Sequence, residues 1–221
     1  MSKTIIISHP EHQLYPLLKE CPNFFELDDE ELVTDHLVGL PKGSRVLDFS
    51  VGTTDEKKGL FELLEDEGLD IYSELSSNWG EGLTEAYPRL KGVMGSSFYS
   101  PQQTYEIWGR TEKDTSLLNT FFEEQGLKTQ TVSSPGIGLH FPRVLAQIIN
   151  EAFFALEDGL ATSKDIDKAM CFGVNYPLGP FEWLEKCGVA PVLHLLDELY
   201  AITGDPRYRA AMSLRKKLLR N

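Results

Sequence analysis

Residues 45–75, RVLDFSVGTTDEKKGLFELLEDEGLDIYSEL, contain a complete strand–helix–strand pattern. The apolar run Arg45–Ser50 predicts a buried strand. Thr53 and Glu56 have the capping-box spacing that begins a helix, and Gly68 is placed to end that helix. A second strand-like run, Leu69–Leu75, follows directly. Two short strands joined by one helix are typical of a parallel α/β layer.

The same alternation continues on both sides of this unit. Before it, three consecutive isoleucines predict a strand that His9-Pro10 ends, and a helical stretch then runs to Pro22. The further predicted strands are Lys3–Ser8, Val93–Tyr99, Thr104–Trp108 and Lys128–Val132, and the further predicted helices are His12–Cys21, Thr84–Leu90 and Lys113–Gln125. Residues 1–134 therefore predict an α/β domain with a largely parallel sheet.

After Ser133–Gly136 the spacing of apolar residues becomes helical throughout. Thr162 with Asp165 begins one helix, and Pro180 takes the first position of another. One long helix carries its apolar residues along a single face, namely Val144, Leu145, Ile148, Ile149, Ala152, Phe153 and Leu156, and two more helices are predicted over Val192–Thr203 and Arg207–Leu219. We predict an all-α second domain over residues 135–221.

The acidic residues are concentrated in the first domain. The chain has 34 Asp and Glu against 21 Lys and Arg, a net charge of -13. Residues 1–134 contain 24 acidic and 11 basic groups, whereas residues 135–221 contain ten of each. Such a surface repels phosphate, so we expect no nucleic-acid partner. The alternative is that the acidity only maintains solubility.

Composition also bounds the class of protein. With 221 residues, 41% hydrophobic and 25% charged, the chain is typical of a soluble globular protein. No apolar run approaches the ~18 residues of a membrane helix, and Met1–His9 does not resemble a signal peptide. Cys21, Cys171 and Cys187 lie far apart and predict reduced thiols in the cytoplasm. The histidines lack metal-ligand spacing, so no metal site is predicted.

Five motifs of the helical half occur in a characteristic order. They are Asn150–Ala152, Leu156–Gly159, Asp165–Met170, Tyr176–Glu182 and Gly204–Tyr208. This series resembles the C-terminal domain of the 3-hydroxyacyl-CoA dehydrogenases, and its Pro-x-Gly-Pro-Phe-Glu element after Asp-Ile-Asp is quite specific. The resemblance implies a helical domain that packs on a Rossmann domain, helps to form an acyl-CoA cleft and makes the homodimer contact.

The first half resembles the later part of the same family's Rossmann domain. The matching segments are Lys57–Phe61, Ser77-Asn78, Gly95–Pro101 and Tyr105–Ile107. The fold implied is a shortened Rossmann-like α/β domain followed by the all-α domain. Ser77, Asn78 and Ser97 are the candidate substrate-binding residues that the resemblance implies.

The family's NAD-binding turn has no counterpart in the sequence. Family members place a G-x-G-x-x-G turn after the first strand, where glycine lets the backbone approach the pyrophosphate. Here the strand continues into Ser8–Gln13, which contains a proline and a glutamate, and no glycine precedes Gly39. The next stretch is also too short for the family's second and third strand–helix units and their adenosine-binding acid. We therefore expect the NAD site to be lost and no cofactor to bind.

The family's catalytic positions are mostly replaced. Ser97 stands where the resemblance places the proton-accepting histidine, and its hydroxyl cannot act as a base near pH 7. Gly80 and Pro142 stand at the positions of the family's serine and asparagine. Glu106 matches the glutamate that orients the histidine, although a strand-end acid facing water explains it too. His140, at the start of the long helix, is either a relocated base or an ordinary helix-start histidine.

These observations predict a 3-hydroxyacyl-CoA dehydrogenase-like protein without NAD-dependent activity, which acts as an acyl-CoA-binding or regulatory dimer. The alternative is an active 3-hydroxybutyryl-CoA dehydrogenase of fatty-acid metabolism that uses His140 as its base. A different acyl-CoA reaction in the same cleft, without NAD, is the third hypothesis.

Overall fold

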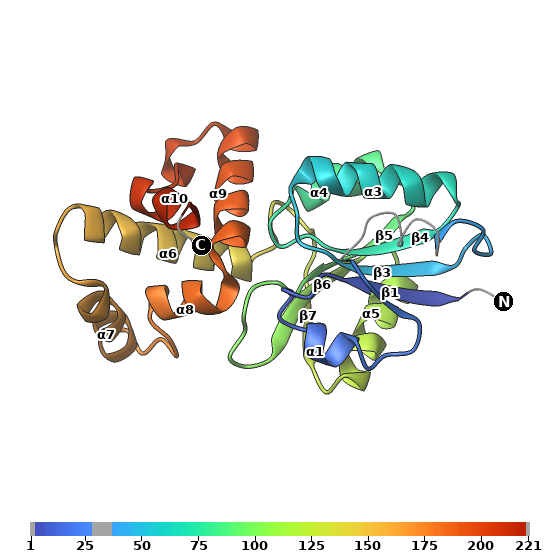
Figure 1. Ribbon diagram of the computed structural model, residues 1–221, viewed down its shortest axis with the longest axis horizontal. Helices are drawn as coiled ribbons and strands as arrows, with labels where there is room; N and C mark the ends of the chain where they lie inside the picture. Colours follow the sequence, from blue (N-terminus) through green and yellow to red (C-terminus); the bar gives the residue numbers. More distant parts are fainter. Residues whose placement is uncertain (1–2, 28–36, 220–221) are drawn as a thin grey trace.

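The computed structural model describes residues 3–27 and 37–219. Figure 1 shows an α/β domain built on one twisted sheet and, beside it, a domain made of helices. The predicted class, a Rossmann-like domain followed by an all-α domain, is confirmed. No helix among the described residues is long and apolar enough to cross a membrane.

The sheet has seven strands in the order β2-β1-β3-β4-β5-β6-β7. They are β1 (Thr4–Ser8), β2 (Phe24–Glu26), β3 (Arg45–Phe49), β4 (Asp70–Glu74), β5 (Leu90–Gly95), β6 (Thr104–Gly109) and β7 (Lys128–Thr131). Every neighbouring pair is parallel except β5 and β6. The chain passes from β1 to one side of the sheet and then to the other, so the strand order reverses between β1 and β3.

Helices cover both faces of the sheet (Figure 1). Helices α3 (Thr54–Asp66) and α4 (Gly80–Ala86) pack on one face, and α1 (Tyr15–Leu18) and α5 (Glu112–Glu124) pack on the other. The predicted capping box at the start of α3 is present, since Thr53 and Glu56 bond to each other's backbone. A second capping box at Thr111 begins α5.

Two expectations for the first 27 residues were wrong. The predicted helix His12–Cys21 is a single turn, because Pro16 occupies its first turn, where no earlier helical turn can precede it, and the chain leaves the helical region before Pro22. The stretch after β1 was expected to be too short for the family's second strand–helix unit, but it contains β2, which pairs in parallel with β1 at the edge of the sheet. The helix predicted over Thr84–Leu90 also lies earlier, at Gly80–Ala86.

The helical domain is built around three packed helices. Its elements are α6 (Phe141–Glu157), α7 (Ser163–Gly173), α8 (Pro180–Cys187), α9 (Val189–Thr203), a 3₁₀ turn (Pro206–Tyr208) and α10 (Met212–Leu218). Leu145, Ile149, Leu184 and Leu196, from α6, α8 and α9, are buried in one apolar cluster. Phe98 from the segment after β5 is fully buried in the same cluster, so the sheet supplies part of the helical core.

Candidate functional site

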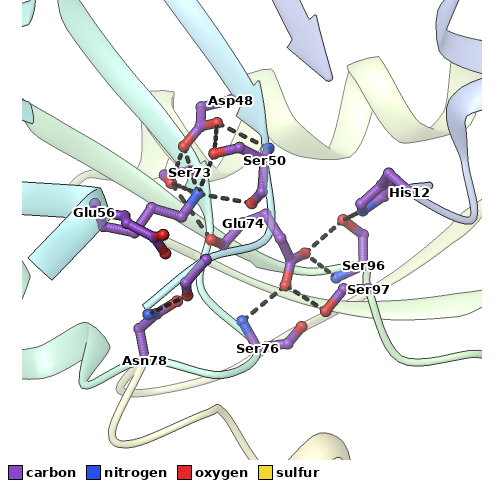
Figure 2. Close-up of polar contacts among 12 residues, drawn as sticks. His12, Asp48, Ser50, Glu56, Ser73, Glu74, Ser76, Asn78, Ser96 and Ser97 are labelled. Atoms are coloured by element: carbon purple, nitrogen blue, oxygen red, sulfur yellow. Dashed lines mark hydrogen bonds and ion pairs between the residues drawn. The ribbon is translucent and has the colours of Figure 1, made fainter. Parts of the chain in front are cut away.

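The candidate site lies where the strands end nearest to the helical domain (Figure 1). Ligands of open parallel sheets bind outside the carboxyl ends of the strands, near the point where the strand order reverses. Buried polar side chains gather at these ends (Figure 2). They come from the turn after β1 and from the ends of β3, β4 and β5. Within the described residues no group of His, Cys, Asp or Glu side chains is arranged to hold a metal ion.

A buried ion pair ties α3 to β3. Lys57 Nζ lies 2.6 Å from Asp48 Oδ2, and the two side chains are only 2% and 0% exposed. The ammonium also donates to the Ser50 carbonyl and hydroxyl at 2.8 and 2.9 Å and lies 3.1 Å from Ser73 Oγ. Because a buried charge must be paired and hydrogen-bonded, this set fixes the ends of β3 and β4 against α3.

Glu74, the last residue of β4, forms a second buried cluster with the segment after β5 (Figure 2). Its carboxylate accepts hydrogen bonds from Ser76 N at 2.7 Å, Ser96 Oγ at 2.6 Å and Ser97 Oγ at 3.0 Å. The backbone N–H of Ser96 donates to it as well. The hydroxyl of Ser97, a predicted substrate-binding residue that the resemblance places at the family's histidine position, therefore donates to the Glu74 carboxylate.

His12 extends this cluster into the turn after β1. Its Nδ1 accepts the N–H of Leu14 at 3.1 Å, which places the proton of the neutral ring on Nε2, 3.4 Å from Ser96 Oγ. Burial lowers the pKa of His12 to about 4, because the charged ring would lose its hydration. Gln13 Nε2 donates to the Ser96 carbonyl. The turn after β1 is thus fastened onto the end of β5.

This turn does not fit the pyrophosphate of NAD. No glycine lets the backbone approach a phosphate, helix α1 is one turn long, and the His12 and Gln13 side chains fill the space toward β5. Glu26, the last residue of β2, stands at the end of the strand where dinucleotide-binding folds place the acid that holds a ribose. The Tyr15 hydroxyl donates to its carboxylate. An acid, Glu26, is thus present at the position where the sequence predicted none, but the phosphate-binding turn is not present.

The structure brings Glu106 and His140 together. Glu106 lies on β6 opposite Gly95, two residues before Ser97, and its side chain is 14% exposed. Its Oε2 accepts the backbone N–H groups of His140 and Phe141 at 2.8 and 2.9 Å. Its Oε1 lies 3.4 Å from Nδ1 of His140, whose side chain is 65% exposed. One carboxylate therefore caps the start of α6 and also faces an imidazole that solvent can reach.

Ser77 and Asn78, the other predicted substrate-binding residues, are buried where the two domains meet. Ser77 Oγ donates to the Pro191 carbonyl of α9 at 2.9 Å. Asn78 Nδ2 donates to the Gly52 carbonyl at 3.0 Å and lies 3.3 Å from Thr54 Oγ1. Both side chains are therefore used within the protein, and their contact with a substrate stays a prediction.

Sequence reasoning missed His12, Asp48 and Glu74 as members of buried clusters. The available signal was that Asp48 and Glu74 sit at or near the ends of otherwise apolar strands. Their partners come from other elements of the sheet, so only the tertiary structure shows that they are paired. Lys57 was noticed only within a matching segment, and its ion pair was not foreseen.

Comparison with known proteins identifies the helical half. Residues 138–221 match the family model described as the C-terminal domain of 3-hydroxyacyl-CoA dehydrogenase. The chain is 41% identical over 99 residues to 3-hydroxyadipyl-CoA dehydrogenase of Escherichia coli K12, covering 45% of this chain and 21% of that protein. It is 28% identical over 186 residues to 3-hydroxybutyryl-CoA dehydrogenase of Clostridioides difficile, covering 80% of this chain and 66% of the relative.

The likeness extends to solved structures. The structure of (S)-3-hydroxybutyryl-CoA dehydrogenase from Ralstonia eutropha superposes with a TM-score of 0.64 at 25% identity, over 90% of this chain and 70% of that one. The chain thus spans only a fifth to about two thirds of the length of the two curated relatives.

Proposed function

We propose that this chain, whose residues 138–221 match the C-terminal domain of 3-hydroxyacyl-CoA dehydrogenase, acts, as members of that family do, on 3-hydroxyacyl-CoA thioesters, with His140 as the group that accepts the proton of the 3-hydroxyl. The observation that carries the proposal is the pairing of His140 with Glu106. In the family's arrangement a glutamate orients the histidine. Here the glutamate is on the matching strand, and the histidine comes from the start of α6 instead of from position 97.

The geometry suits general base catalysis. A neutral imidazole whose Nδ1–H faces the Glu106 carboxylate keeps the lone pair of Nε2 available, and the carboxylate stabilises the imidazolium that forms. Nε2 makes no hydrogen bond to any residue in the described part of the chain, and the ring is largely exposed. Ser97 follows the β5 partner of Glu106 by two residues, and we propose that it contacts the same substrate.

A second candidate is thioester binding without dehydrogenation. Oxidation of the alcohol removes a hydride from carbon as well as a proton from oxygen. The family's hydride acceptor is NAD, and the turn after β1 does not fit its pyrophosphate. This candidate matches the interpretation of the chain as an acyl-CoA-binding or regulatory protein, and the three unpaired cysteines support a reducing, cytoplasmic setting for either candidate.

The first test measures NADH formation from 3-hydroxybutyryl-CoA and NAD, together with calorimetric binding of the thioester. The first candidate requires NAD to bind without the turn after β1. It predicts turnover by the wild type and a loss of about 10²–10⁴-fold in His140→Gln, with thioester binding kept. Lys58→Gln, on the exposed face of α3, is the matched control and should change neither quantity.

The outcomes separate the candidates. Binding without turnover in the wild type supports the second candidate and excludes the first. Turnover that survives in His140→Gln would show that another group is the base. Absence of thioester binding in the wild type would contradict both candidates.

We also propose that the chain forms a homodimer through the helical domain. Helix α7 is amphipathic but contains no buried residue. Phe172 at its end is 87% exposed, and Leu160 and Val174 beside it are 75% and 56% exposed. Exposed large apolar side chains that gather around one helix mark an interaction surface. A second copy of the same helix is an occupant that buries them in both protomers.

A further inference from the structure

A hollow of about 510 Å³ lies at the opposite end of the sheet from the candidate site. It is bounded by Thr4 and Arg45, the first residues of β1 and β3, and by one side of helix α5. The polar clusters described above lie at the other ends of these strands. A hollow of this size is within the range of small-molecule sites, and the proposed function does not use it.

The hollow exists because α1 is too short to cover the sheet. Ile6 and Leu47 face the same side of the sheet as α1 and α5 and lie beneath its floor, buried at 4% and 0% exposure. Leu117 and Phe121 on α5 lie beside the stripe that packs in the core, and both remain half-buried. A crossover helix of ordinary length would cover Leu117 and Phe121, whereas the single turn of α1 leaves these two side chains lining the hollow.

The rim is held in place by the protein itself. Asn23 adopts a left-handed backbone with φ of 59°. Its carbonyl accepts the N–H of Ile6 at 3.1 Å, and its side chain donates to the Thr4 carbonyl at 3.1 Å. Across the hollow, Cys21 Sγ lies 3.5 Å from Gln125 Oε1 and joins the α1–β2 loop to the end of α5. A preformed rim reduces the ordering cost of binding.

Two cations without acidic partners line the hollow. Within the described residues, 3–27 and 37–219, neither Arg45 nor Lys113 forms an ion pair. Glu124, near the end of α5, is the acid on the lining, so the hollow has an excess of one positive charge. This contrasts with a domain in which acidic groups outnumber basic ones by more than two to one. The local charge therefore favours an anion.

We propose that this hollow binds an amphipathic carboxylate. Its apolar chain lies along the half-buried α5 side chains Leu117 and Phe121, above the floor beneath which Ile6 and Leu47 are buried. Its carboxylate lies between Arg45 and Lys113. The site is separate from the His140–Glu106 pair, so it stands whether or not the chain acts on thioesters.

Isothermal titration calorimetry with decanoate, below its micelle concentration, tests the proposal on the full chain. We expect saturable binding at one site, and decanol, which has the same chain without the charge, should bind at least about tenfold more weakly. Arg45→Gln and Lys113→Gln should each weaken decanoate binding to a similar degree. Lys128→Gln, an exposed lysine of the same domain outside the lining, is the matched control and should bind as the wild type does.

A blocking variant locates the ligand. Thr120→Trp places a large ring in the hollow from an exposed position of α5 and should abolish decanoate binding while the melting curve stays unchanged. Absence of decanoate binding in the wild type would overturn the proposal. Equal binding of decanol and decanoate, or unchanged affinity in both cation variants, would also overturn it. The activity assay with 3-hydroxybutyryl-CoA is independent of all of these outcomes.

Discussion

The buried basic side chains Lys57 and His12 differ in whether a negative charge lies in contact with them. Lys57 is enclosed with a carboxylate 2.6 Å away. His12 is equally buried, but its ring nitrogens meet only the Leu14 N–H and the Ser96 hydroxyl. The charged imidazole therefore has no contacting anion to offset its lost hydration, which is why its pKa falls to about 4.

The lowered pKa of His12 makes stability depend on pH. The unfolded chain binds this proton near pH 6.5 and the folded chain only near pH 4, so stability falls as pH drops from about 6.5 toward 4. We expect the wild type to lose about 2 kcal/mol more than His12→Gln between pH 7 and pH 5, measured from urea midpoints. His9→Gln, in the same turn, is the control and should behave as the wild type. Equal pH dependence of the wild type and His12→Gln would contradict the assignment.

The contacts at the start of helix α8 explain the residues of the Pro-x-Gly-Pro-Phe-Glu motif. Pro180 begins the helix, and the Glu182 carboxylate accepts the N–H of Gly179 at 3.2 Å. A Cβ at Gly179 would meet the side chain of Asp167 at 2.2–2.3 Å, so only glycine allows this approach. Asp167 Oδ1 in turn accepts the N–H of Phe181 at 2.9 Å. The Asp-Ile-Asp and Pro-x-Gly-Pro-Phe-Glu elements are thus two halves of one helix junction.

The junction predicts different costs for neighbouring substitutions. Phe181 is 8% exposed and packs 4.9 Å from the ring of Phe153, so Phe181→Ala should lower the free energy of unfolding by about 3–5 kcal/mol. Glu182→Gln should cost under about 1 kcal/mol, because it weakens only a cap at a helix start. Urea midpoints of the two variants check this order. If Glu182→Gln were the more damaging change, or if it alone abolished thioester binding, the element would belong to a functional site.

Elements with local signals could be predicted from the sequence, and those set by distant contacts could not. Thr53 and Glu56 fixed the start of α3 because a capping box involves only four adjacent residues. Strand β2 was missed because it has three residues and depends on pairing with β1. Glu106 and His140 were both named as candidates, but 34 residues separate them in the chain. Only the fold shows that one contacts the other.

The two domains differ in net charge, and this difference suits the proposed dimer contact through the helical domain. The acidic excess lies in the α/β domain, whereas the helical domain has equal numbers of acidic and basic residues. Two copies that meet through the helical domain therefore keep their acidic halves apart. The exposed apolar residues around α7 lie on this neutral half.

Light scattering should report about twice the monomer mass of 24.9 kDa for the full chain at micromolar concentration. Phe172→Glu places a charge at the most exposed large apolar side chain near α7 and should shift the mass toward the monomer. Leu17→Glu, an exposed apolar position in the α/β domain, is the matched control and should leave the mass unchanged. A wild-type monomer at that concentration would contradict the dimer.

Phe98 and Glu106 couple the stability of the α/β domain to that of the helical domain. Phe98 leaves the sheet to fill the core of the helices, and Glu106 satisfies the first N–H groups of α6. A protein cut before α6 would leave a cavity in the helical core and an uncapped helix. We therefore expect the helical half to be less stable on its own than in the full chain, and the two halves to unfold in one cooperative transition.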